Sequence, residues 1–177
     1  MLIDPTADPD LFTIEQCKMM GMWPPGDAMA PGIYPYIKRL KTKDKLTVVE
    51  VGVRKGENVA YTLELDVDKK IGSYYGVVTH KNYEELLDKN LSGEDRFTKG
   101  FDPYKKKQHV DVVFLHSECD LDKNLKRYYN VLCEGGIFAG NDHMKDHVKI
   151  SLRDFRRDNK IGIPINVSRG CWFWWKR

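Results

Sequence analysis

The 177-residue sequence contains no apolar run close to the ~20 residues that a membrane-spanning helix needs. Lysine and arginine (29) barely outnumber aspartate and glutamate (26), and a formal net charge of +3 is too small to indicate a nucleic-acid partner. Hydrophobic residues make up 41% and charged residues 31%, a balance typical of a globular chain and not of a disordered one. These features favour one domain without a membrane partner.

Cysteine is also scarce. The four cysteines, Cys17, Cys119, Cys133 and Cys171, are scattered, with no CxxC pair and no zinc-ligand spacing. Such cysteines are typical of unpaired thiols in a reducing compartment. The acidic, proline-rich start of the sequence does not resemble a signal peptide. We therefore expect a cytoplasmic protein.

Valine-rich apolar runs alternate with segments whose apolar residues recur at helical spacing. The expected strands are 46–52, 75–80, 96–99, 110–117 and 135–142, followed by two short terminal runs, 163–167 and 171–176. The expected helices are 13–20, 33–41, 57–70, 82–91, 121–132 and 147–159. This alternation predicts an α/β fold with a mainly parallel sheet. Only three residues separate the last two strands, so these must be antiparallel.

The two ends of the chain differ in composition from the middle. Residues 1–32 hold most of the prolines and methionines, which predicts an N-terminal arm or lid in front of a core at 33–177. No internal repeat or linker appears, so residues 1–177 are expected to form a single domain. In the aromatic tail, strand alternation predicts that Trp172 and Trp174 face one way and that Phe173 and Trp175 face the other, mostly within the core.

The first predicted strand runs into a glycine-containing turn with the pattern Glu50-x-Gly52-x-x-x-Gly56. Glycine at such a turn lets the backbone approach a ligand, and ligands of doubly wound sheets bind at the carboxyl ends of strands. The phosphate-binding patterns GxGxxG and GxxxxGK[ST] are absent. A nucleoside with a zwitterionic tail therefore fits better than a pyrophosphate. The alternative is a tight turn that merely contains two glycines.

Four segments occur in the order, and with nearly the spacing, of a known family. They are VVEVGVRKG, VDVVFLHSECD, VLCEGGIFAGND and HVKISLRDF…INVSRGCWFWWKR. The chain resembles the class I S-adenosylmethionine-dependent methyltransferases, and within them the small-molecule O-methyltransferase-like group, over roughly residues 33–177. The resemblance implies a Rossmann-like, doubly wound, mainly parallel seven-stranded sheet with an antiparallel C-terminal strand.

The resemblance also implies S-adenosyl-L-methionine as cofactor. The family's ribose-binding acid at the end of the second strand is replaced here by Thr79 and His80. Its Asp-Gly-x-His motif is replaced by a segment that begins with His116. The expected cofactor-binding residues are Glu50, Gly52, Arg54, Gly56, Asn58, Thr79, His80 and Ser117.

Methyl transfer to oxygen needs a deprotonated nucleophile held in line with the methyl group. His116 and Asp142 are the expected catalytic residues, with Glu118, Asn141 and His143 close by. His116, Asn141 and Asp142 have the residue types of a divalent metal site as well. The alternatives are that Asp142 caps the following helix and that His143 is an exposed structural histidine.

Three functions remain open at this point. The expected function is methyl transfer to a hydroxyl of a small-molecule acceptor. The first alternative is a methyltransferase-fold protein that binds a nucleoside ligand or a partner without catalysis, because two family motifs are replaced. A nucleic-acid-modifying methyltransferase is favoured only by the sequence pI of about 8.5 and the run Lys105–Lys107. A homo-oligomer is compatible with the sequence.

Overall fold

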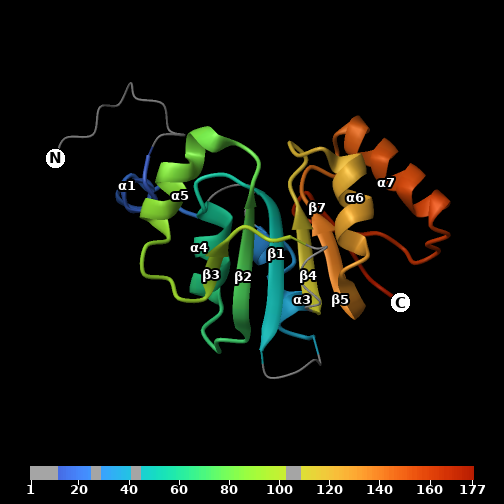
Figure 1. The fold of residues 1–177 in the computed structure, drawn as a ribbon, viewed down its shortest axis with the longest axis horizontal. Coiled ribbons are helices and arrows are strands. Elements are labelled where there is room, and N and C mark those ends of the chain that lie inside the picture. Colours follow the sequence, from blue (N-terminus) through green and yellow to red (C-terminus); the bar gives the residue numbers. More distant parts are fainter. Residues whose placement is uncertain (1–11, 25–28, 41–44, 103–108) are drawn as a thin grey trace.

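Seven strands form one sheet with the order β3-β2-β1-β4-β5-β7-β6 (Figure 1). The structure, a computed structural model, describes residues 12–24, 29–40, 45–102 and 109–177. The strands are β1 Leu46–Val53, β2 Ile71–Val78, β3 Phe97–Lys99, β4 Val110–Leu115, β5 Leu132–Gly140, β6 Asn166–Ser168 and β7 Cys171–Trp175. The pairs among β1 to β5 are parallel, and β7 is antiparallel to both of its neighbours. The predicted fold class and sheet are confirmed.

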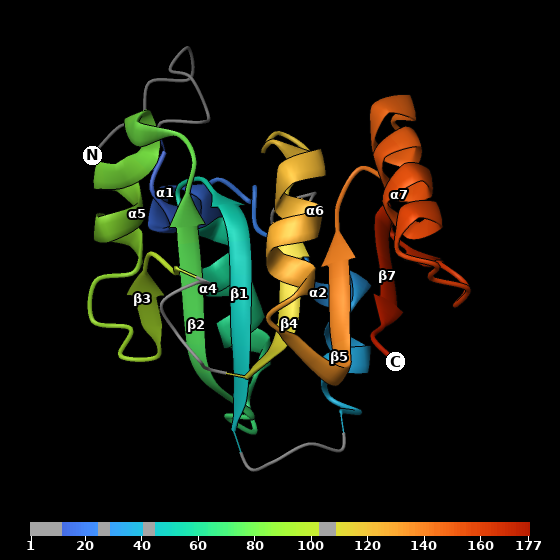
Figure 2. The same cartoon turned by 45° about the vertical axis from the view of Figure 1, so that its right-hand side comes forward.

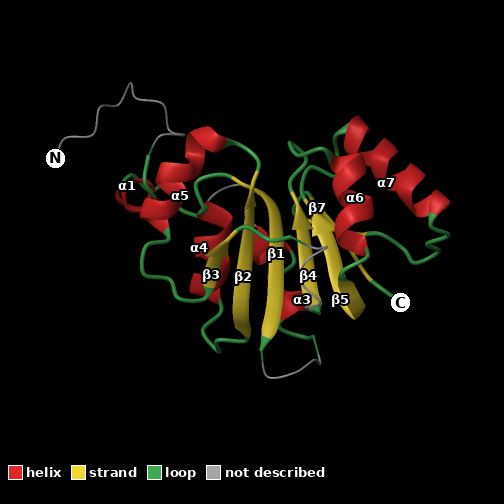
Figure 3. Cartoon of the chain, viewed as in Figure 1, coloured by secondary structure: helices red, strands yellow, loops and turns green. Residues whose placement is uncertain are grey.

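Helices cover both faces of the sheet (Figure 3). Apolar residues of α2 to α5 pack in one buried cluster with the sheet, and those of α6 and α7 pack in the other. Figure 2 shows α6 and α7 side by side. None of the described helices is both long and apolar enough to span a bilayer. The helices are α1 Ile14–Met19, α2 Met29–Gly32, α3 Tyr34–Ile37, α4 Glu57–Leu65, α5 Glu84–Asn90, α6 Leu121–Tyr129 and α7 Asp146–Asp158.

The spacing of the apolar residues in α6 explains which face of the helix packs against the sheet. Leu121, Leu125 and Tyr128 recur at i, i+4 and i+7 and are all buried. The side chain of Asp120 accepts a hydrogen bond from the backbone N–H of Lys123 and so caps the first turn. α7 repeats the pattern, and its buried residues are Val148, Leu152 and Phe155.

Several predicted elements have other bounds in the structure. The predicted helix 57–70 ends at Leu65, and the predicted strands 75–80 and 135–142 are Ile71–Val78 and Leu132–Gly140. Two further elements contain proline. The predicted helix at 33–41 is the short α3, preceded by α2. Pro35 stands in the first turn of α3, where a backbone N–H would have no partner within the helix, so its absence costs no hydrogen bond. The strand predicted at 163–167 begins only at Asn166, since Pro164 has no N–H to donate to a ladder.

The terminal aromatic residues alternate as predicted. Trp172 and Trp174 are buried in the cluster beneath α6 and α7, whereas Phe173 belongs to the cluster on the opposite face. Trp175 packs against the same cluster as Phe173. All four cysteines are free thiols, as expected.

The described part of residues 1–32 contributes to the core. Thr13 and Gln16 form a reciprocal capping box that starts α1. Met29 is fully buried in the same cluster as Ile33, so packing is continuous across the predicted boundary between arm and core.

Gly140, at the end of β5, offers a direct test of this packing. A Cβ there would lie 2.4 Å from the carbonyl oxygen of Leu115 and 2.4 Å from the Trp172 ring. We expect Gly140→Ala to lower the free energy of unfolding in urea by about 1–3 kcal/mol, because neighbouring strands must move apart. Gly162→Ala is the matched control, since a Cβ there meets no described atom within 4 Å. Equal losses in the two variants would contradict this account.

Candidate functional site

Polar residues converge where neighbouring strands end. Glu50 lies in β1, paired in register with Phe114 of β4, and His116 follows β4 directly. Asn141 is the first residue after β5. Since the carboxyl ends of parallel strands lie at one edge, this is the ligand-binding edge of a doubly wound sheet.

These side chains form a buried chain of hydrogen bonds across four strands. The backbone N–H of Ser117 donates to Asn141 Oδ1 at 2.8 Å, and Asn141 Nδ2 lies 3.5 Å from His116 Nδ1. His116 Nε2 lies 2.6 Å from Glu50 Oε1, and the Tyr74 hydroxyl of β2 donates to Glu50 Oε2. Glu50 is only 1% exposed. A carboxylate so deeply buried requires such partners, because desolvation disfavours its charge.

The partners assign the direction of each bond. Because Asn141 Oδ1 accepts from Ser117, its Nδ2 amide faces His116 and donates to Nδ1. The other imidazole nitrogen, Nε2, must then donate to Glu50, since a carboxylate only accepts. Burial and the adjacent Glu50 charge raise the pKa of Tyr74 well above its ordinary value, so its hydroxyl keeps its proton and donates. Every link has one donor and one acceptor.

The two glycines of the β1–α4 turn serve the packing of the chain itself. Gly52 and Gly56 have φ of +95° and +86°, which other residues adopt only with strain. A Cβ on Gly52 would lie 2.8 Å from His116 Cβ. A Cβ on Gly56 would lie 2.9 Å from the side chains of Leu87 and Leu91. Both glycines thus make room for residues of the same chain, and their part in cofactor binding stays a prediction.

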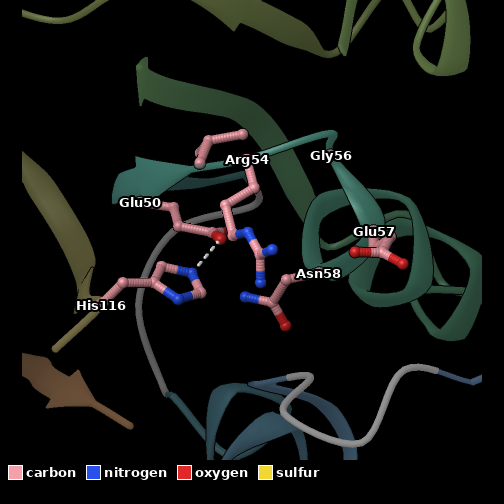
Figure 4. Close-up of a pocket in the computed structure, with 7 residues that line it drawn as sticks. Glu50, Arg54, Gly56, Glu57, Asn58 and His116 are labelled. Carbon is pink, nitrogen blue, oxygen red and sulfur yellow. Dashed lines mark hydrogen bonds and ion pairs between the residues drawn. The ribbon is translucent and has the colours of Figure 1, made fainter. Parts of the chain in front are cut away.

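A small pocket lies beside this network at the start of α4 (Figure 4). Its volume is about 20 Å³, and its lining includes four of the predicted cofactor residues: Glu50, Arg54, Gly56 and Asn58. His116 lines it too, so a predicted catalytic residue adjoins the predicted cofactor residues. In Figure 4 the side chains of Arg54 and Asn58 point toward each other.

Asn58 and Arg54, which both line the pocket, each form a hydrogen bond with a residue outside its lining. Asn58 Oδ1 accepts the backbone N–H of Met29, while its buried Nδ2 has no hydrogen-bond partner among the described residues. Arg54 donates to the Tyr83 hydroxyl at 3.0 Å and lies over the Tyr83 ring. A buried amide donor without a partner is unfavourable unless something binds to it.

The two residues expected near the ribose lie outside this small pocket. Thr79 is exposed, and His80 is half-buried beside Tyr83. The buried Nε2 of His80 has no hydrogen-bond partner in the described part of the chain. Their part in ribose binding stays a prediction.

Asp142 follows Asn141 and occupies a left-handed backbone conformation, with φ of +56°. Its Oδ2 accepts hydrogen bonds from the Ser117 hydroxyl and, at 2.7 Å, from Lys145 Nζ. Partial burial alone would raise the pKa of this carboxyl, but the bonds from Lys145 and Ser117 outweigh it and hold the pKa below its usual range. The capping alternative is wrong, because the N-cap residue of α7 is Lys145 and no side chain caps it.

The predicted metal ligands lie close together but have other partners. His116 Nε2 is bound to Glu50, Asn141 Oδ1 to Ser117, and Asp142 to Lys145. Glu118 is exposed. Among the residues that the structure describes, no three His, Cys, Asp or Glu side chains are grouped so as to hold a metal ion. The donor set does not fit a metal ion.

Sequence reasoning missed Tyr74 and Lys145. Tyr74 reaches Glu50 only because β2 pairs with β1 in a register that sets Tyr74 opposite Val48. No local pattern encodes that register. Lys145 lies three residues after Asp142 in the turn before α7, so its proximity could have been inferred from spacing alone.

No protein-family model and no curated protein matches the chain. Solved structures do match it. Precorrin-6y C5,15-methyltransferase from Geobacter metallireducens GS-15 matches with a TM-score of 0.60 and 14% identity over 82% of this chain and 88% of that chain. An S-adenosylmethionine-dependent O-methyltransferase from Thermotoga maritima matches with a TM-score of 0.62 and 19% identity over 85% of this chain and 58% of that chain.

A third match is the fibrillarin pre-rRNA processing protein of Methanococcus jannaschii, with a TM-score of 0.58 and 15% identity over 88% of this chain and 78% of that chain. The three proteins differ in their described roles, so what they share with this chain is architecture. The strand order, the antiparallel β7 and these likenesses show that the chain has the fold of the class I S-adenosylmethionine-dependent methyltransferases.

Proposed function

We propose that this chain is an S-adenosylmethionine-dependent methyltransferase that acts on a hydroxyl group of a small molecule. The observation that carries the proposal is the Asn58 amide, a buried donor without a described partner, aimed into a pocket at the carboxyl end of β1. The fold supports the same cofactor class. A hydroxyl acceptor is supported by Asp142 and Ser117 at the neighbouring strand ends.

The pocket residues suit the amino-acid end of the cofactor. Glu50 can accept from an ammonium group, and Asn58 Nδ2 and Arg54 can donate to a carboxylate. The pocket of about 20 Å³ has room for little more than a water molecule, whereas small-ligand sites span roughly 300–1,000 Å³. Binding of the whole cofactor therefore requires the pocket to widen, and Arg54, a long side chain of the lining whose guanidinium donates to the Tyr83 hydroxyl, is well placed to move.

The chemistry divides between the cofactor and the chain. S-adenosylmethionine supplies, when bound, a methyl group on a sulfonium that an oxygen nucleophile accepts. Asp142, kept ionised at neutral pH by Lys145 and Ser117, accepts a hydrogen bond from the acceptor hydroxyl and orients its oxygen. As the methyl–oxygen bond forms and the methyl–sulfur bond breaks, the hydroxyl proton passes through Asp142 to solvent. The lowered pKa makes Asp142 a weak base, so orientation and proximity supply most of the acceleration.

His116 acts differently from the expectation that it serves as base or metal ligand. Its Nε2 is occupied by Glu50 at 2.6 Å, and its Nδ1 faces Asn141. We assign it a positioning role: it fixes the Glu50 carboxylate toward the pocket that both residues line.

A second candidate function, nucleoside binding without catalysis, is favoured by one observation. His116, which stands where the family usually has Asp-Gly-x-His, is bound to Glu50 and faces Asn141 within the chain. The two functions give the same binding result and differ only in whether any acceptor is methylated.

We expect S-adenosylhomocysteine to bind the parent chain saturably in a calorimetric titration. Asn58→Asp keeps the oxygen that accepts from Met29 but replaces the buried donor with an anion. It should weaken binding at least about tenfold, because a lost bond to a charged group is worth roughly 1.5–3 kcal/mol. Asn130→Asp, the same change at the exposed end of α6, should leave the affinity unchanged. Equal affinities of the two variants for S-adenosylhomocysteine would show that the ligand binds elsewhere.

We expect Asp142→Asn to lower the methyl-transfer rate by about ten- to a hundredfold, because the amide orients a hydroxyl less well and can donate in the wrong sense. Release of S-adenosylhomocysteine from S-adenosylmethionine, measured over a panel of catechols, phenols and alcohols, provides the readout. Asp146→Asn is the matched control, since Asp146 is 93% exposed in the first turn of α7. If the cofactor binds but no acceptor is methylated by the parent chain, the non-catalytic function is correct.

A further inference from the structure

A second, larger hollow of about 340 Å³ lies along α7, and we call it the α7 groove. Its cationic side chains recur on one face of the helix, at i, i+4, i+7 and i+8 from Lys149. Leu152, Ile161 and Ile165 supply its apolar floor. The charged lining consists of Lys149, Arg153, Arg156 and Arg157, and no acidic residue of the described chain lines it.

His143 also lines the α7 groove. It follows Asp142 in the turn after β5, and its backbone N–H donates to the carbonyl of Gly170 at 3.0 Å. Its buried Nδ1 has no hydrogen-bond partner among the described residues. Burial, and then the charge of Lys149, lower the pKa of His143, which indicates a positive environment around the ring.

Arg156 is a cation of the groove that is held by neutral partners. Its guanidinium donates to the carbonyls of Ile161 and Ile163 and lies 5.4 Å from the centre of the Trp174 ring. None of these partners carries a charge, and its buried Nε has no hydrogen-bond partner in the described chain. Burial lowers the pKa of Arg156, which marks an uncompensated charge.

The other cations are neutralised only in part. Lys149 lies 3.6 Å from Asp146, and Arg153 and Arg157 share Asp154. Arg157 also pairs with Asp158 at 3.0 Å. These acids are in α7 but outside the groove lining, and exposed pairs of this kind contribute little. The groove thus retains cationic donors on one side and an apolar floor on the other.

We propose that the α7 groove binds a phosphate monoester of a small, partly apolar molecule. The lining offers more donors than the two oxygens of a carboxylate can accept, whereas a phosphate monoester brings three oxygens and a charge of about −1.5 to −2 at neutral pH. The apolar floor gives the ester's carbon portion a place to pack, and the volume suits a small molecule.

The proposal goes beyond the proposed methyltransferase function and does not depend on it. His143 of the groove lining directly follows Asp142 in the chain, so the bound ester is a candidate for the acceptor. Binding in the groove and binding of S-adenosylhomocysteine at Asn58 are separate measurements, so either can fail alone.

The test is a calorimetric titration with phenyl phosphate, phenol and inorganic phosphate as probes. Phenyl phosphate should bind saturably and about tenfold or more tightly than either of its parts, because only it can fill both the cationic and the apolar side. The double variant Lys149→Gln, Arg153→Gln should weaken that binding about tenfold. Lys123→Gln, Lys126→Gln, the same loss of charge on the exposed side of α6, is the control and should bind like the parent.

Further readouts keep the test decisive. Both double variants should bind S-adenosylhomocysteine like the parent and unfold at similar temperatures; if the groove variant unfolds early, Arg153→Gln alone replaces it. Phenyl phosphate that binds no better than phenol, or equally well to the groove variant and the parent, would overturn the proposal. So would a single-stranded oligonucleotide that binds this groove more tightly than phenyl phosphate with a steep salt dependence, since the ligand would then be nucleic acid.

Discussion

The buried carboxylate of Glu50 is the constraint on which the site depends. At 1% exposure it must be compensated from within the protein, and the Tyr74 hydroxyl and the His116 imidazole do this from the strands on either side of β1. Asn141 extends the chain of bonds to β5. The ends of four strands are thereby fixed relative to one another, and with them the pocket wall and the turn that carries Asp142.

The glycines of the turn after β1 follow from this constraint. Gly52 lets His116 approach β1 closely enough to reach Glu50, and Gly56 lets Leu87 and Leu91 of the α5 region pack against the start of α4. The same compactness leaves only about 20 Å³ beside Asn58. A site with so little free volume must lose some ligand affinity to the free energy of widening the pocket.

Much of the fold could be predicted from the sequence, because its signals are local. The valine-rich runs of β1 and β4, the amphipathic spacing of α6 and α7, and the short turn before β7 each indicate their element without knowledge of the rest. The side-chain partners could not be predicted. That Tyr74 meets Glu50 depends on strand register, and that Gly52 faces His116 depends on which strand pairs with β1. Long-range geometry also sets the partners that His116, Asn141 and Asp142 have in place of a metal ion.

A double-mutant cycle in urea, with Glu50→Gln, His116→Gln and the two together, tests most directly whether this buried pair organises the site. His116→Gln leaves the buried Glu50 charge without its imidazole partner and should cost about 3–5 kcal/mol of unfolding free energy. Glu50→Gln leaves only uncharged groups without their partner and should cost about 1–3 kcal/mol. Removing both should cost less than the sum, and we predict an interaction energy of at least about 2 kcal/mol. Losses that add to within about 0.5 kcal/mol would show that Glu50 and His116 act independently, contradicting the account.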